Sequence, residues 1–116
     1  MVHADVTNHQ PGLEPQTGLE SFRTAIENVM RAVPDSKWTT RRLIAEDDFV
    51  ACRNTWSGTY DGESFRGVAI RSGGRFSVDH VHIYRVVDGR IAEHWVVRDD
   101  LGMVLQLGAT AIRGAD

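Results

Sequence analysis

The chain has 116 residues, of which 41% are hydrophobic and 25% charged, and its formal net charge is −3. This length fits one domain over residues 1–116, and folding at this size buries about two-thirds of the surface that an unfolded chain exposes. The 13 basic residues are scattered among 16 acidic ones, which argues against a nucleic-acid partner because phosphate-binding surfaces concentrate Lys and Arg.

The single cysteine and the N-terminal residues bear on location. Cys52 has no partner for an internal disulfide, so the fold does not depend on an oxidising compartment. No apolar run approaches the roughly 20 residues that cross a bilayer, and "MVHADVTNHQPG" lacks the basic and apolar segments of a signal peptide. We therefore expect a cytoplasmic protein with no membrane partner.

One amphipathic helix is expected near the N-terminus. Residues 1–17 contain two prolines, a glycine and short polar side chains, which predicts an irregular or briefly extended entry. From Gly18 the apolar residues recur every three or four positions, the period of a helix with one buried face. Pro34 ends this helix. The apolar positions are Leu19, Phe22, Ile26, Val29, Met30 and Val33.

Strands follow the helix. "KWTTRRLIAEDDFVACRNTWSGTY" predicts two strands joined at Glu46-Asp47-Asp48, because Thr, Val, Ile and Trp favour extended structure. Further strands run to about Asp99, with turns at Asp61-Gly62 and Gly73-Gly74, and a short apolar segment follows. A helix followed by successive strands predicts an α+β fold, with the helix packed on one face of a curved antiparallel sheet.

The last hairpin contains most of the candidate chemistry. In "FSVDHVHIYRVVDGRIAEHWVVRDD", residues 76–100, Asp88-Gly89 predicts a two-residue primed turn with Val87 opposite Arg90. This register is expected to continue along both strands. It places Tyr84 across from Glu93, His82 across from Trp95, and His80 across from Val97.

One face of this hairpin then mixes apolar and ionisable side chains. His80 lies diagonal to Asp99, at a Cβ separation of roughly 7 Å. A carboxylate and an imidazole on an apolar face are candidates for proton transfer near neutral pH. The opposite face is expected to be ordinary surface, with an Asp79–Arg98 ion pair and an exposed His94. The mixed face comprises Phe76, Val78, His80, His82, Tyr84, Val86, Ile91, Glu93, Trp95, Val97 and Asp99.

Other interpretations of these residues are open. A strand histidine is at least as often a half-buried, hydrogen-bonded residue, and Trp95 and Tyr84 are more often core than substrate platform. His80-x-His82 suits a metal, with Asp99 or Glu93 as a further ligand, but no second histidine pair closes the coordination shell. We therefore expect no metal.

The residues that carry a family resemblance lie in two stretches. "GLESFRTAIENVMRAVPDSKWTTRRLIAEDDFVACRNTWSGTYDG" followed by "IYRVVDGRIAEHWVVRDDLGMVLQLG" closely resembles the SnoaL-like polyketide cyclases of the nuclear transport factor 2-like superfamily. The resemblance implies a cone, in which a strongly bent antiparallel sheet wraps around helices and encloses an apolar pocket. Members normally begin with an additional helix of about twenty residues, which is not expected here. The open end is then covered by a partner subunit or by the N-terminal segment, or the pocket is more exposed.

The resemblance also implies site residues. Characterised members close polyketide rings without a cofactor, using an Asp and a His as acid–base groups, which assigns these roles to Asp99 and to His80 or His82. Asn8 and His9 resemble polar residues near the pocket mouth. Tyr60 stands where the family often has a histidine.

Two functions are compatible with this pattern. The first is a cofactor-independent lyase, isomerase or cyclase acting on an apolar carbonyl compound, with Trp95, Tyr84 and Phe76 forming an apolar wall that excludes water. The second is a module that binds a small apolar ligand or dimerises without turnover. Val81, Ile83 and Val96 form an apolar strip that suits a homodimer.

Overall fold

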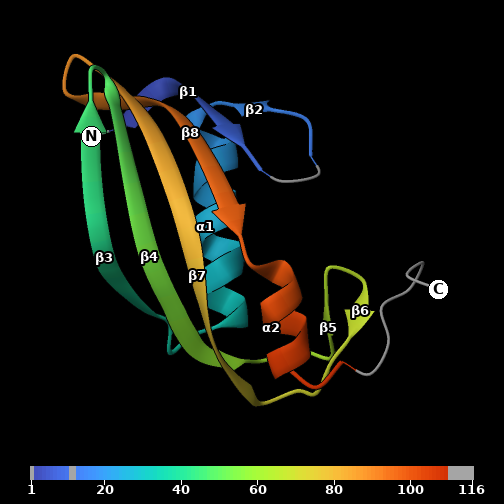
Figure 1. Cartoon of the computed structure of the whole chain (residues 1–116). Helices are drawn as coiled ribbons and strands as arrows, with labels where there is room; N and C mark the ends of the chain where they lie inside the picture. The colour runs from blue at the N-terminus through green and yellow to red at the C-terminus, as the bar shows by residue number, and fades with distance from the viewer. Residues whose placement is uncertain (1, 11–12, 110–116) are drawn as a thin grey trace.

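The computed structural model describes residues 2–10 and 13–109 and has two sheets and two helices (Figure 1). The main sheet has the strand order β2-β1-β8-β7-β4-β3, and a separate two-stranded sheet is formed by β5 and β6. The predicted α+β class is confirmed. The elements are β1 (Val2–His9), β2 (Gln16–Thr17), α1 (Leu19–Ala32), β3 (Lys37–Glu46), β4 (Phe49–Tyr60), β5 (Ser64–Phe65), β6 (Val68–Ala69), β7 (Gly74–Val87), β8 (Arg90–Arg98) and α2 (Asp100–Gln106).

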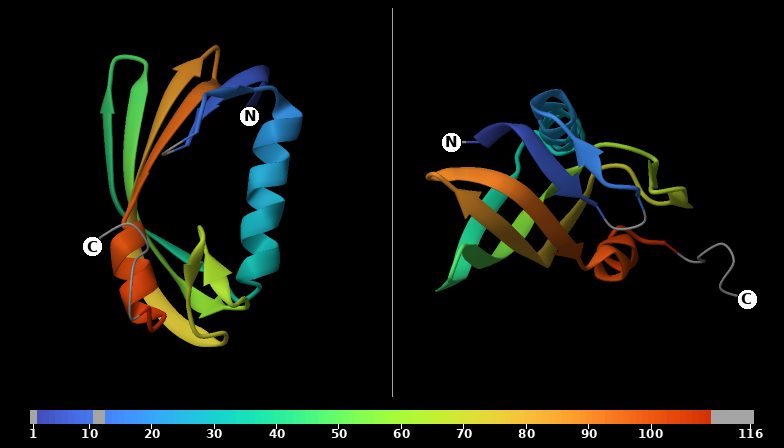
Figure 2. Two further views of the ribbon diagram at one scale, coloured as in Figure 1. Left: turned by 90° about the vertical axis from the view of Figure 1, so that its right-hand side faces the viewer. Right: turned by 90° about the horizontal axis from the view of Figure 1, so that it is seen from above.

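Helix α1 crosses the concave side of the sheet, as predicted from its periodicity (Figure 2). At its start the Gly18 amide donates to the Val6 carbonyl of β1 at 2.8 Å, and at its end the Asp61 amide donates to the Ala32 carbonyl at 2.9 Å. No residue of α1 is fully buried. The helix is therefore held at both ends, and its apolar face lines a space above the middle of the sheet.

The predicted hairpin at Glu46-Asp47-Asp48 is confirmed, since β3 ends at Glu46 and β4 begins at Phe49. Strands β4 and β7 then pair over their whole facing length, from Phe49 opposite Arg85 to Tyr60 opposite Gly74. In the six-stranded order β7 is a central strand beside β8, and β4 lies between β7 and the edge strand β3 (Figure 1).

The N-terminal segment, predicted to be irregular or briefly extended, begins with the eight-residue strand β1 of the main sheet. Strand β1 pairs in parallel with β8, with Asn8 opposite His94 and His9 opposite Trp95. Val6 and Asn8 are buried on the inner side of the sheet. The partner strand lies more than eighty residues further along the chain, so the local composition of the segment did not reveal this pairing. Pro11 and Gly12 lie outside the described residues.

The turn at Asp88-Gly89 is confirmed, but the register beyond it is not. Both residues have positive φ, 52° and 74°, as the primed turn requires, and Val87 faces Arg90. The register then shifts between Arg85 and Val86, because Ala92 is an extra residue on β8. Such a bulge exchanges the two faces of the strand beyond it.

The bulge changes which side chains share a face. His94 lies opposite Tyr84, Val96 opposite His82, and Arg98 opposite His80. Glu93, Trp95 and Val97, predicted to share the histidine face, therefore lie on the convex face. The predicted apolar strip loses Val96, which is buried in the interior. The predicted Asp79–Arg98 ion pair is also wrong, since Asp79 pairs with Arg53 at 3.2 Å.

The hydrophobic core occupies the end of the sheet where α2 packs. Gly58 of β4 is required there, because a Cβ atom at this position would lie 2.5 Å from Val33 Cγ1 and 2.9 Å from Asp35 Oδ1. The rest of the concave face is left for a cavity. None of the helices described is long and apolar enough to cross a membrane. The buried core cluster consists of Val33, Trp56, Phe76, Val78, Met103 and Leu107.

Candidate functional site

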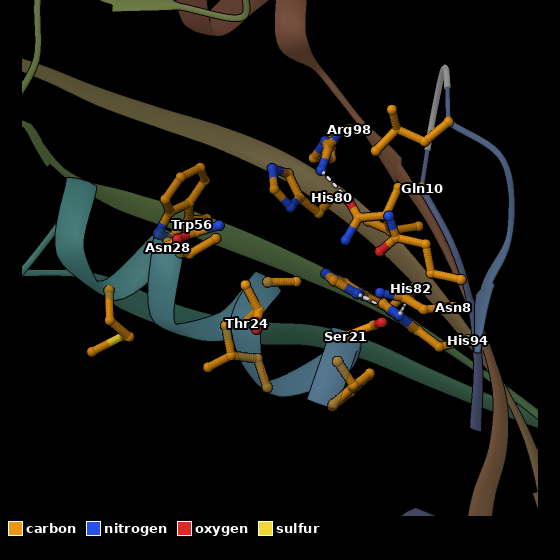
Figure 3. Close-up of a pocket in the computed structure, with 18 of the residues that line it drawn as sticks. Asn8, Gln10, Ser21, Thr24, Asn28, Trp56, His80, His82, His94 and Arg98 are labelled. Carbon is orange, nitrogen blue, oxygen red and sulfur yellow. Dashed lines mark hydrogen bonds between the residues drawn. The ribbon is translucent and has the colours of Figure 1, made fainter. Parts of the chain in front are cut away.

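A cavity of about 810 Å³ lies between α1 and the concave face of the sheet, and it is partly open to solvent. This is the size of a pocket for a small organic molecule. The helix supplies mainly apolar residues, among them Phe22, Val29 and Met30, while the sheet supplies Trp38 and Trp56. Polar side chains from β7, β8 and β1 meet at the wall opposite the helix, and α1 adds Ser21, Thr24 and Asn28 (Figure 3).

Three of these polar groups form a hydrogen-bonded chain. His82 Nδ1 lies 2.8 Å from His94 Nε2, and His94 Nδ1 lies 2.7 Å from Asn8 Oδ1. The three strands β7, β8 and β1 are neighbours in the sheet, and one residue from each points into the cavity (Figure 3). The chain therefore runs from the interior of the sheet toward the ligand space.

The chain fixes the tautomers of both imidazoles. An amide oxygen only accepts hydrogen bonds, so His94 Nδ1 carries the hydrogen and donates to Asn8. The Nε2 atom of neutral His94 is then an acceptor, and His82 Nδ1–H donates to it. The lone pair of neutral His82 consequently lies on Nε2, a buried atom with no hydrogen-bond partner among the described residues.

Burial keeps these imidazoles uncharged. Burial, with a smaller contribution from His82, lowers the pKa of His80 and of His94 to about 4. Burial and, to a lesser degree, the Arg98 charge also lower the pKa of His82. A neutral His82 is able to accept a proton at neutral pH, which is the first requirement for a general base.

A second polar group adjoins this chain. His80 packs with its ring edge against Trp38 and Trp56, at centroid distances of 5.5 and 5.4 Å. Arg98 lies directly across the strand pair from His80 and donates from Nη1 to Gln10 Oε1 at 2.9 Å. Figure 3 shows this group at one end of the cavity wall, beside the His82–His94–Asn8 chain.

The structure brings four of the predicted site residues to the cavity. His80, His82, Tyr84 and Asn8 line it. Asp99 is exposed and does not line it, because its side chain accepts a hydrogen bond from the Gly102 amide at the start of α2.

The remaining predicted residues lie elsewhere. Phe76 belongs to the hydrophobic core. Trp95 is on the convex face, stacked on His9 at a centroid distance of 5.0 Å, and His9 Nε2 lies 2.6 Å from Glu93 Oε2. Tyr60 packs against Phe65 at the margin of the core. None of these side chains reaches the described cavity lining.

Two site residues, His94 and Arg98, were assigned to the outer surface by the sequence prediction. The side chains of β8 alternate between the two faces of the sheet as predicted, but the bulge at Ala92 exchanges the faces for the residues that follow it. No sequence signal distinguishes His94 from the other polar residues of β8, which are Arg90, Glu93 and Arg98.

The residues present do not favour a metal centre. Within residues 2–10 and 13–109, His, Cys, Asp and Glu side chains form no group of three or more suited to a metal ion. The nitrogen atoms of His82 and His94 that face each other are joined by a hydrogen bond, so neither is free to bind a shared cation.

The sequence profile of the SnoaL-like polyketide cyclases matches residues 1–107. The chain belongs to the SnoaL-like polyketide cyclase family. No curated protein matches it. The curved sheet and the two helices agree with solved members of this family.

Three solved structures illustrate the similarity. TsrD from Streptomyces laurentii is 35% identical, with 93% of this chain and 78% of TsrD covered and a TM-score of 0.80. IdmH from Streptomyces antibioticus, provisionally assigned as a polyketide cyclase, is 29% identical. The comparison covers 94% of this chain and 83% of IdmH, with a TM-score of 0.78. AclR from Streptomyces galilaeus, provisionally assigned as a hydroxylase, is 28% identical. The comparison covers 92% of this chain and 77% of AclR, with a TM-score of 0.75.

Membership in the SnoaL-like family supports small-molecule binding in the cavity and a function of the cyclase or isomerase type. The family fold alone does not fix the reaction, since relatives on the same fold have different assignments. The reaction must be argued from the residues that line this particular cavity.

Proposed function

We propose that this SnoaL-like protein is a cofactor-independent cyclase or isomerase that removes a proton next to a carbonyl group of an apolar substrate, with His82 as the general base. The observation that carries this proposal is the buried Nε2 atom of His82, which ends the chain formed with His94 and Asn8 and has no hydrogen-bond partner among residues 2–10 and 13–109. His94 and Asn8 are positioning residues, because they act through His82.

The reaction is a proton transfer followed by a bond change. His82 Nε2 takes the proton from the carbon α to the carbonyl, and the C–H electron pair moves to form an enolate. The imidazolium formed keeps its Nδ1–H···His94 hydrogen bond, so its orientation does not change. In a cyclase the enolate carbon attacks a second carbonyl, whose C=O electron pair moves to oxygen, and the alkoxide formed takes the proton back from His82. In an isomerase His82 returns the proton to another carbon.

The surroundings support this chemistry. An N–H of neutral His80 is available for the oxyanion, and the apolar side chains of α1 and of Trp38 and Trp56 exclude water from it. The Asp99 carboxylate remains a predicted acid–base group. Its hydrogen bond to Gly102 favours a role in starting α2, and His82 is the better candidate for the base.

The proposal is tested by hydrogen–deuterium exchange at the α carbon of 2-tetralone, an apolar bicyclic ketone, followed by NMR in D₂O. We expect the protein to accelerate exchange and His82→Gln to lower the rate by about 10²- to 10⁴-fold. Asp99→Asn is the matched control, because Asn is an equally good N-cap. If Asp99→Asn abolishes exchange and His82→Gln does not, the base is Asp99.

The alternative is a non-catalytic module that binds a small apolar ligand in the same cavity. The low pKa values of His80 and His94 are compatible with this function, because a neutral polar cluster also suits passive binding. Saturable binding of 2-tetralone without any accelerated exchange would favour it.

We also propose a cytoplasmic homodimer that associates through the convex face. Large apolar side chains are exposed there, including Phe49 and Val97, beside Val81, Ile83 and Trp95. Sedimentation of the wild type and of Val97→Glu tests this. We expect a dimer that the substitution weakens, and a wild-type monomer at every concentration would contradict it. The cytoplasmic location rests on the single Cys52.

A further inference from the structure

The guanidinium of Arg98 is buried at the cavity wall, and its donors are only partly matched by acceptors among the described residues. Its side chain is only 13% exposed, and its Nη1 is occupied by Gln10. Its Nε and Nη2 atoms are buried and make no hydrogen bond within the part of the chain that the structure describes. A buried charged donor left without an acceptor is costly, so such a group in a ligand cavity indicates an acceptor on the ligand.

The charge around Arg98 is incompletely balanced. Asp100 Oδ1 lies 3.5 Å from Arg98 Nε, while its other oxygen lies 3.3 Å from Arg66 Nε. Two guanidinium groups therefore share one carboxylate, and both arginines line the cavity. Burial lowers the pKa of Arg98, and the nearby Arg66 charge lowers it further. The guanidinium nevertheless remains protonated at neutral pH.

The cavity offers no acidic side chain to complete the balance. Among the described residues that line it, the only carboxylate belongs to Glu20. That side chain is 86% exposed and lies 3.4 Å from Arg23 on the same helix. The positive end of the cavity is thus free to attract an anionic group of a ligand.

We propose that Arg98 is a specificity-determining residue that binds a carboxylate on the ligand, so that the substrates of this protein are apolar carbonyl compounds with an acidic head group. The carboxylate accepts hydrogen bonds from Arg98, which leaves the N–H of His80, directly across the strand pair, for the oxyanion. This inference rests on the proposed function for the reaction, but it concerns binding alone.

The geometry also orients the ligand. The ring centroids of His80 and His82 are 5.8 Å apart, which is about the width of a small ring system. A carboxylate held at Arg98 therefore directs the adjoining part of the ligand toward His82 Nε2. The apolar remainder of the molecule lies against Trp38, Trp56 and α1. Arg98 in this way determines which carbon of the ligand lies next to the proposed base, His82.

Calorimetric titration with 2-naphthoate and 2-naphthamide tests the proposal without any turnover. The two probes share a ring system and differ in the charge of the head group. We expect the wild type to bind 2-naphthoate at least tenfold more tightly than 2-naphthamide, as charge-assisted hydrogen bonds to a buried guanidinium imply. Equal affinities in the wild type, or no detectable binding of 2-naphthoate, would overturn it.

Variants identify the residue. Arg98→Met is expected to remove the preference for 2-naphthoate and to leave the affinity for 2-naphthamide within about threefold. Arg98→Lys keeps the charge and is expected to retain part of the preference, which guards against a misfolded Arg98→Met. Arg75→Met, an exposed arginine on β7, is the matched control and should change nothing. A preference that survives Arg98→Met would contradict the assignment.

Failure here is separable from failure of the proposed function. If 2-tetralone exchange depends on His82 but the two naphthalene probes bind equally, the reaction stands and the carboxylate site does not. If 2-naphthoate is preferred but no exchange is catalysed, the carboxylate site stands and the reaction does not.

Discussion

His82 Nδ1 lies 2.8 Å from His94 Nε2. In this hydrogen bond His82 is the donor and His94 the acceptor. Because His94 is itself bonded to Asn8, the free lone pair of His82 is placed on Nε2. The proposed base is in this way oriented by two neutral residues, without a carboxylate.

Loss of the Asn8 amide should destabilise the fold. Asn8→Ala leaves the His94 Nδ1–H, buried on β8, without its acceptor, which costs about 1 to 3 kcal/mol. Urea denaturation measures the change in the free energy of unfolding. Asn28→Ala, which removes an exposed amide that accepts a hydrogen bond from Arg31, is the control and should change stability little. An effect of equal size in both variants would contradict the buried role of Asn8.

Stability should fall as the pH drops below 6.5. The pKa of His80 and of His94 is about 4 in the folded protein and about 6.5 in an unfolded chain. The unfolded state therefore binds more protons between these values, and acidification favours unfolding. The free energy of unfolding should decrease by at most about 1.4 kcal/mol per pH unit for each imidazole.

Urea denaturation at several pH values between 7.5 and 5 measures this slope. His80→Phe removes one of the two imidazoles from a position lined by Trp38 and Trp56 and should make the slope smaller. A stability that does not change from pH 6.5 to 5, or an unaltered slope in the variant, would show that the histidines are not buried as described.

Tryptophan fluorescence should report on the cavity through two of the three tryptophans. Trp38 and Trp56 line it and stack on each other at 5.1 Å, whereas Trp95 lies on the convex face against His9. We expect 2-tetralone to quench the wild type and Trp95→Phe, and to quench Trp56→Phe less. Loss of quenching in Trp95→Phe alone would mean that the bulge at Ala92 is misplaced.

A side chain at Gly58 should not be tolerated. The added methyl group of Gly58→Ala would meet Val33 and Asp35 closer than atoms pack, and overpacking of this kind costs about 1 to 3 kcal/mol. Thermal unfolding should show a lower melting temperature, with Ser57→Ala on the same strand as the control. An unchanged melting temperature would show that the helix end is free to move.

Local signals in the sequence predicted the elements well, because each depends on neighbouring residues. The apolar spacing from Gly18 predicted α1, and Asp88-Gly89 predicted a turn that the positive φ angles confirm. Strand β1 was missed, since its pairing with β8 joins distant segments and its short polar residues are typical of loops.

The site was predicted only in part for a different reason. His80 and His82 were placed on the inner face of β7, and both line the cavity. The bulge at Ala92 bends β8, and nothing in "RIAEHW" marks it. A shift of one residue exchanged His94 and Arg98 with Trp95 and Val97, so half of the polar wall was assigned to the surface.

The orientation of the base is tested most directly by ¹⁵N NMR of the histidine side chains near pH 7. We predict that His82 and His94 are both neutral with the hydrogen on Nδ1, and that Asn8→Ala disturbs the tautomer of both. If His82 carries its hydrogen on Nε2, or is charged at this pH, it has no lone pair toward the cavity and the proposed base is wrong.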